Sequence, residues 1–198
     1  CAIVPNGIDT VYFHPGKTTA VNFDVGFVGN LGYLPNIGAA RFLIQDIGLA
    51  WFNKYGSSLK ILVAGARPDS TLTSLATDFV VVQGWMEDIR EAYASIQILV
   101  APIFFGTGQQ NKIMEAMACG VPVICSSEVA KGVGAIHLEH LLIANTAVEF
   151  VEAITQLKHD EDLRLKISQQ ALEYVKNHFS WEKSVQILDK LLDAKYLA

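Results

Sequence analysis

Apolar runs of strand length alternate with segments of helical period along most of this chain, and several of the runs end at glycine. Such alternation is typical of a parallel sheet covered by helices on both faces. The sequence therefore predicts an α/β fold, a doubly wound parallel sheet. The expected strands are 25–29, 59–64, 79–83, 98–102, 121–125 and 141–144, and the expected helices between them are 35–54, 72–77, 88–94 and a segment ending at 119.

The composition changes beyond residue 146, where charged residues become frequent. Three amphipathic helices are expected there, with Asp160 and Ser180 as N-caps. We predict three parts: a linker segment, one α/β domain and a terminal helix. They cover residues 1–22, 23–178 and 179–198, and the three C-terminal helices are expected at 148–157, 162–177 and 181–194.

Composition excludes several classes of protein. Hydrophobic residues make up 51% and charged residues 18% of 198 residues, which is incompatible with disorder. The apolar runs are far shorter than the ~18 residues that span a bilayer. A net charge of −5 without a Lys/Arg block argues against a nucleic-acid partner.

Three cysteines, Cys1, Cys119 and Cys125, lack metal-ligand spacing and are expected to be small buried hydrophobes in a reducing, cytoplasmic compartment. The chain begins at a cysteine within an apolar stretch, without methionine or signal peptide. We expect it to be cut from a longer protein.

Glycines gather where the expected strands end. In open α/β sheets ligands bind beyond the carboxyl ends of the strands, and glycine permits close approach to the backbone. Each glycine alone is more typical of an ordinary strand-to-helix turn than of a ligand site. Together they predict a phosphorylated ligand across this edge, near Gly29, Gly32, Gly65, Gly84, Gly106 and Gly108.

The segment from Ile96 to Ser127 contains two charged residues, Lys112 and Glu115. Three positions apart, they share one face of the expected helix. That helix follows Gly106-Thr107-Gly108, so its N-terminal amides form a natural anion site, and Lys112 could pair with the same phosphate. Glu115 is placed to accept hydrogen bonds from a ribose. The competing interpretation is an ordinary i,i+3 ion pair on a solvated face.

Other sites find little support in the sequence. The chain lacks a P-loop, the third glycine of a dinucleotide fingerprint, a nucleophile elbow and a metal-ligand cluster. The five histidines are scattered and are expected to be surface or capping residues. His137 and His140 are the two that retain interest as candidate bases.

Several segments together resemble the C-terminal domain of GT-B glycosyltransferases of group 1, or family 4. They are Val4-Pro5-Asn6-Gly7-Ile8-Asp9 with Phe13-His14-Pro15, Phe27-Val28-Gly29, Leu62-Val63-Ala64-Gly65, Gln83-Gly84-Trp85 with Asp88, the run from Gly106 to Val123, and Phe179-Ser180-Trp181-Glu182. The run from Gly106 to Val123 is the most specific. The resemblance covers essentially the whole chain and implies a Rossmann-like, donor-binding half of a retaining enzyme.

In that family a carboxylate at the position of Glu115 binds the ribose, loop amides at the helix start bind the diphosphate, and residues near Gly84-Trp85 face the base. The resemblance thus implies a nucleotide-sugar site of the strand-end glycines with Asn30, Trp85, Thr107, Gln109, Lys112 and Glu115. Thr107 and Lys112 are candidate transition-state contacts, because charge develops on the leaving diphosphate. Neither a metal nor another cofactor is expected.

Two departures from the family pattern concern charge. Thr107 stands where the family often has a glutamate that contacts the donor sugar. The loop after the first strand, residues 30–36, lacks the Arg and Lys that often neutralise the diphosphate. We hypothesise that Lys112 takes over part of that charge.

The expected partners are a nucleotide-diphosphate sugar and an N-terminal acceptor-binding domain of the same parent chain, so this half alone should be inactive. Any membrane contact would have to come through the missing half, and polysaccharide biosynthesis is the expected setting. Two alternatives stay open. One is a nucleotide-sugar epimerase of the same fold, and the other is a non-catalytic binding or scaffold domain.

Overall fold

The computed structural model describes residues 4–16, 21–105 and 110–196. Six strands in this part of the chain form one sheet in the order β3-β2-β1-β4-β5-β6, and every neighbouring pair is parallel. The predicted parallel sheet is confirmed. The strands are β1 (Phe23–Val28), β2 (Ile61–Ala64), β3 (Val80–Gln83), β4 (Ile96–Ala101), β5 (Val123–Cys125) and β6 (Leu142–Ile143).

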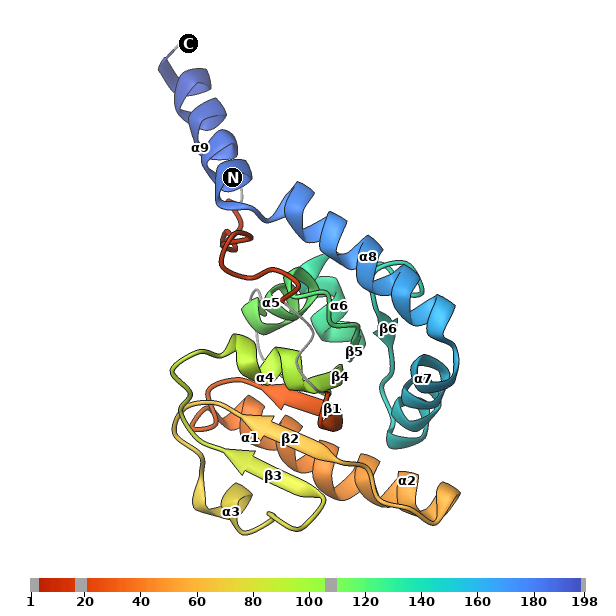
Figure 1. The fold of residues 1–198 in the computed structure, drawn as a ribbon. Coiled ribbons are helices and arrows are strands. Elements are labelled where there is room, and N and C mark those ends of the chain that lie inside the picture. Colours follow the sequence, from red (N-terminus) through yellow and green to blue (C-terminus); the bar gives the residue numbers. More distant parts are fainter. Residues whose placement is uncertain (1–3, 17–20, 106–109, 197–198) are drawn as a thin grey trace.

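The strand order reverses between β1 and β4, so right-handed crossovers place the helices that follow β1 and β2 on one face and those that follow β4 and β5 on the other. The helices are α1 (Leu34–Arg41), the π-helix η1 (Phe42–Ile47), α2 (Gly48–Tyr55), α3 (Ser70–Thr73), α4 (Arg90–Ser95), α5 (Asn111–Ala118), α6 (Ser127–Val133), α7 (Ala147–His159), α8 (Glu161–His178) and α9 (Trp181–Tyr196). α7 packs on η1 and α2, and α8 contacts α5 and α7 (Figure 1).

β1 and β4 form the centre of the sheet because their side chains are almost entirely apolar. Val25, Phe27, Ile98 and Leu99 are completely buried. Gly26 lies beside Ile96, where a Cβ would approach the Ile96 side chain to 2.6 Å. These strands therefore stay close enough for a regular ladder, and their carboxyl ends carry the candidate site.

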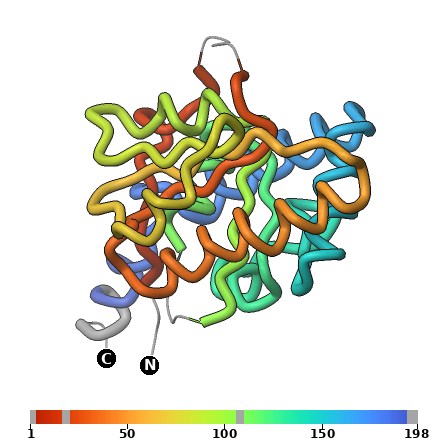
Figure 2. Tube along the Cα trace, turned by 90° about the horizontal axis from the view of Figure 1, so that it is seen from below, coloured from red at the N-terminus to blue at the C-terminus, as the bar shows by residue number. Residues whose placement is uncertain are grey.

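The helix predicted over 35–54 is one rod, seen across the near face in Figure 2. Pro35 stands in its first turn, where a missing N–H costs little. Gly56 ends it in the left-handed conformation at φ 68°. The π-helical segment at its centre was not predicted, since π-helix has no simple periodic signature.

The helix α6 is missing from the prediction. Its signals were present in the sequence: Ser126 caps the N-terminus by accepting from the Val129 amide, and Gly134 ends the helix at φ 70°. The segment has few residues with helical periodicity. The cap residues were therefore better indicators of this helix than its apolar pattern.

The C-terminal helices follow the prediction closely. Asp160 accepts from the Leu163 amide and Ser180 from the Lys183 amide, so both predicted N-caps are confirmed. Figure 1 shows α9 extending away from the sheet beside the N-terminal segment, and Ile8 bridges Ser180 at this point. In the portion of the chain that the structure covers, no helix is long and apolar enough to cross a membrane.

Candidate functional site at the carboxyl edge of the sheet

Two glycines bring the ends of β1 and β2 into direct contact. Gly29 donates to the Ala64 carbonyl at 3.0 Å, and Gly65 donates to the Gln83 carbonyl at 3.1 Å. Gly65 has φ 142°, and a Cβ on it would lie 1.8 Å from the Gly29 carbonyl oxygen. Glycine is therefore required at position 65, because a Cβ there would force the loops after β1 and β2 apart. We call the backbone of Gly29 and Gly65 the glycine floor of this edge.

Lys112 lies in the first turn of α5 and reaches over Gly29. Its Nζ donates to Asn36 Oδ1 at 2.7 Å and to Gln110 Oε1 at 3.2 Å. A Cβ on Gly29 would lie 3.1 Å from Lys112 Cε, so the glycine leaves room for the lysine stem. Burial lowers the pKa of Lys112 to about 8.

Asn36 fixes the position of this lysine. It is 5% exposed and lies in α1, and its Nδ2 donates to the Asn30 carbonyl at 2.9 Å. One amide side chain thus joins the β1 loop to the lysine on α5. Buried polar groups of this kind hold one geometry when every member has a partner.

Glu115 lies one turn further along α5 and has a separate partner. The fully buried Tyr93 donates its hydroxyl to Glu115 Oε2 at 2.7 Å. Burial raises the pKa of Tyr93 well above its usual value, so the phenol stays protonated. Burial also raises the pKa of Glu115, and the Tyr93 hydrogen bond and the Lys112 charge oppose that rise.

Lys112 and Glu115 are not the solvated ion pair of the competing interpretation. Both are partly buried, and the structure records no Lys112–Glu115 ion pair within the residues it describes. Each charge is held by a neutral side chain instead, Asn36 for the lysine and Tyr93 for the glutamate. This arrangement leaves both charges available to a ligand.

A cavity of about 390 Å³ opens at this edge, a volume in the range of small-molecule sites. It brings together five predicted site residues: Gly29 and Asn30 after β1, Gly65 after β2, and Lys112 and Glu115 on α5. Its lining is Val28, Gly29, Asn30, Gly65, Ala66, Arg67, Ile89, Lys112 and Glu115. Arg67 was not predicted.

Other predicted site residues lie around this cavity or outside the described chain. Gly32 is exposed, next to Arg67. Gly84 and the 71% exposed Trp85 follow β3 and do not line the cavity, so their contact with a base stays a prediction. Gly106, Thr107, Gly108 and Gln109 lie outside the described residues.

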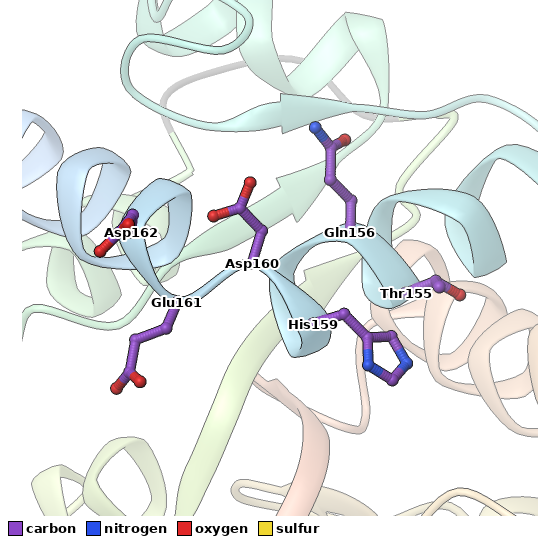
Figure 3. A pocket seen from close by; sticks show the side chains of 6 residues that line it. All are labelled: Thr155, Gln156, His159, Asp160, Glu161 and Asp162. Carbon is purple, nitrogen blue, oxygen red and sulfur yellow. The ribbon is translucent and has the colours of Figure 1, made fainter.

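A larger hollow of about 600 Å³ lies at the turn between α7 and α8. In Figure 3 the side chains of Glu161 and His159 point to one side of this turn and Gln156 to the other. Asp160 caps α8. Charged groups that diverge on an open surface do not form a binding site, so the smaller cavity is the better candidate.

The histidines that retained interest are structural. The ring nitrogen Nδ1 of His140 accepts from the Ile136 amide at 3.2 Å, and Nδ1 of His137 accepts from the Ile143 amide at 2.9 Å.

Burial raises the pKa of both Cys119 and Cys125 to about 12, consistent with unreactive thiols. The described residues contain no group of three or more His, Cys, Asp or Glu side chains placed to hold a metal ion.

Comparison with known protein families identifies the family of this domain. The profile of the family described as Glycosyl transferases group 1 matches residues 22–160. The chain belongs to the group 1 glycosyltransferases. The match includes the six strands, Gly29, Gly65 and α5. The residues that line the cavity in this group 1 domain therefore all lie within the part of the chain that matches the family.

A curated relative is an uncharacterized 44.6 kDa protein in the cps region of Klebsiella pneumoniae. It is 25% identical over 91% of this chain and 49% of its own length. The chain thus spans about half the length of this relative. Family membership therefore describes a domain, and the activity of a whole group 1 enzyme is a separate question.

Solved structures share the fold at low sequence identity. Anabaena HepE in complex with UDP has a TM-score of 0.80 at 18% identity, covering 98% of this chain and 57% of that one. Sucrose-phosphate synthase from Thermosynechococcus elongatus has a TM-score of 0.76 at 19% identity, covering 98% and 52%. A C-terminal domain of a group 1 protein from Francisella tularensis has a TM-score of 0.70 at 18% identity, covering 88% and 100%.

Proposed function

We propose that this chain is the donor-binding domain of a glycosyltransferase that uses a nucleotide-diphosphate sugar. The observation that carries the proposal is the cavity at the carboxyl edge, where Lys112 and Glu115 lie over a floor of Gly29 and Gly65. A cation and a carboxylate one helical turn apart match the two parts of a nucleoside diphosphate. The cation suits the phosphates, and the carboxylate suits the ribose hydroxyls.

The diphosphate is placed at the start of α5. There the amides at the helix N-terminus and the Lys112 ammonium act on the same anion. A charge-assisted hydrogen bond from Lys112 contributes about 1.5–3 kcal/mol. Because charge grows on the diphosphate as the glycosidic bond breaks, the same contact stabilises the transition state.

The ribose is placed at Glu115. Tyr93 occupies Oε2 of the carboxylate, which leaves Oε1 for a ribose hydroxyl. Val28, Ala66 and Ile89 provide apolar walls to the same cavity. A wall of this kind excludes water from the hydrogen bonds to the sugar ring.

The reaction type and the acceptor are further parts of this proposal. We propose hexosyl transfer with retention of configuration, without a metal or other cofactor, to an acceptor held by a second domain outside this chain. The solved complexes of Anabaena HepE with UDP and with UDP-glucose support the choice of donor. The cps-region relative supports a role in polysaccharide assembly, and the chain's coverage of about half of its relatives supports a second domain.

Nucleotide calorimetry tests this function. We expect saturable binding of at least one of UDP, GDP and ADP to the 198-residue chain, and no sugar transfer by the chain alone. A cytoplasmic enzyme of this kind needs its acceptor domain to complete the reaction. Absence of binding by all three nucleotides would contradict the proposal and favour the scaffold alternative.

Glu115→Gln tests the ribose contact. The amide oxygen still accepts from Tyr93, so the fold is retained, whereas the carboxylate charge is lost. We expect the affinity for the tightest nucleoside diphosphate to fall by about tenfold or more, and Glu115→Ala to give at least the same loss. The 2′,3′-dideoxy form of that nucleotide serves as the control ligand, and its affinity should be nearly unchanged. An equal loss for both ligands would assign Glu115 a structural role.

A further inference from the structure

Arg67 has an unusual backbone conformation at the rim of the cavity. It follows β2 and has φ 58°, which is uncommon for a residue other than glycine. A left-handed conformation costs free energy for an L-residue with a long side chain. Residues held in this way cluster at binding sites and switches, where the surrounding structure imposes the conformation.

The surrounding loops impose it here. The Leu31 amide donates to the Ala66 carbonyl at 2.8 Å, which joins the loop after β1 to the loop after β2. The Gly32 amide donates to Asn30 Oδ1 at 3.1 Å. A Cβ on Gly32 would lie 3.2 Å from Arg67 Cβ, so the glycine provides the space in which the arginine stem lies.

The Arg67 guanidinium has no hydrogen-bond or ion-pair partner among the residues that the structure describes. Arg90 and Arg164, by contrast, pair with Asp88 and Glu161. The neighbouring acid, Asp69, accepts instead from the Thr71 amide and hydroxyl. Arg67 is therefore an available cation that lines the same cavity as Lys112 and Glu115.

The charge of the cavity depends on this residue. Its charged lining residues are Arg67, Lys112 and Glu115, so Lys112 alone would just cancel an ionised Glu115. A nucleoside diphosphate brings at least two negative charges. A site without net charge would contribute little electrostatic free energy to binding them, whereas Arg67, in the loop after β2, gives the site a net positive charge.

We propose that Arg67 is the second cationic contact of the diphosphate, reaching it from the β2 loop while Lys112 binds it from α5. This inference rests on the proposed donor function. The planar guanidinium donates two parallel hydrogen bonds to phosphate oxygens, which a lysine cannot reproduce. The left-handed backbone at Arg67 serves to direct that side chain over the glycine floor.

Arg67→Asn tests the inference, because asparagine removes the charge and tolerates the left-handed conformation. For the tightest binder among UDP, GDP and ADP, we expect about a tenfold or greater loss of affinity. Affinity for the parent nucleoside, measured by ligand-observed NMR, should not change. Arg67→Lys should recover part of the loss, and Lys131→Gln on α6 is the distant control. The thermal midpoint of Arg67→Asn should not fall.

The outcomes separate the two proposals. If the unaltered chain binds the diphosphate no more tightly than the nucleoside, the donor function itself fails. If the unaltered chain discriminates and Arg67→Asn discriminates equally well, the role of Arg67 is overturned while the donor function stands. An equal loss for nucleoside and diphosphate would also overturn it, since Arg67 would then act on loop structure.

Discussion

Gly65→Ala is expected to unfold the carboxyl edge of the sheet and to abolish nucleotide binding. The added Cβ would lie 1.8 Å from the Gly29 carbonyl oxygen, and φ 142° is unfavourable for alanine. The overlapping atoms belong to the Gly29 backbone and cannot rotate away as a side chain could. The ends of β1 and β2 must therefore separate. We expect a destabilisation of about 3 kcal/mol or more, which lowers the thermal midpoint by roughly 6–12 °C in a domain of this size.

Gly84→Ala is the matched control for this substitution. Gly84 directly follows the adjacent strand β3, and a Cβ there would meet Pro68 at 3.8 Å, an ordinary contact. Its thermal midpoint should lie within about 2 °C of the unaltered chain. Scanning calorimetry measures both variants. If Gly65→Ala had the same thermal midpoint as Gly84→Ala, the close contact between Gly65 and the Gly29 carbonyl would be contradicted.

Lys112→Met is expected to cause the largest loss of diphosphate affinity with the fold retained. Methionine keeps the length and apolar stem of the side chain and removes the ammonium that lies over Gly29. We expect the affinity for a nucleoside diphosphate to fall by about 10–150-fold, corresponding to about 1.5–3 kcal/mol. Nucleoside affinity should be unchanged. Calorimetry measures the loss, and unchanged diphosphate affinity would refute the role of Lys112.

The affinity of the unaltered chain should also depend on pH. With the pKa of Lys112 lowered to about 8, the ammonium is present below that pH and is lost above it. Affinity should fall by up to about tenfold between pH 7 and pH 9, whereas the smaller affinity of Lys112→Met should stay nearly constant. Unfolding does not explain such a fall. The folded-state pKa is below the unfolded one, so this group favours folding increasingly as pH rises from about 8 to 10.5.

The elements that the sequence predicted well are those with local signals. The parallel sheet follows from apolar runs whose length and spacing are visible in the chain. Lys112 and Glu115 were recognised as a pair because three positions on a helix define one face. The glycines at 29 and 65 were recognised because both follow buried strands, where a parallel sheet brings successive loops to one edge.

The partners of those charges were not predictable because they come from distant parts of the chain. Asn36 contacts Lys112 across 76 positions, and Tyr93 contacts Glu115 across 22. Neither contact has a periodic or compositional signal, since each depends on how the helices pack. Arg67 was missed for a related reason. Its stem lies in space that Gly32 of the neighbouring loop leaves open, and a positive φ at arginine has no sequence signature.

The location of the bound nucleotide tests the central claim most directly. Backbone amide shifts of the isotope-labelled chain, titrated with the tightest of UDP, GDP and ADP, report which residues the ligand approaches. We predict the largest changes at Gly29, Asn30, Gly65, Lys112 and Glu115. Changes confined to residues 155–162, at the hollow between α7 and α8, would contradict the account.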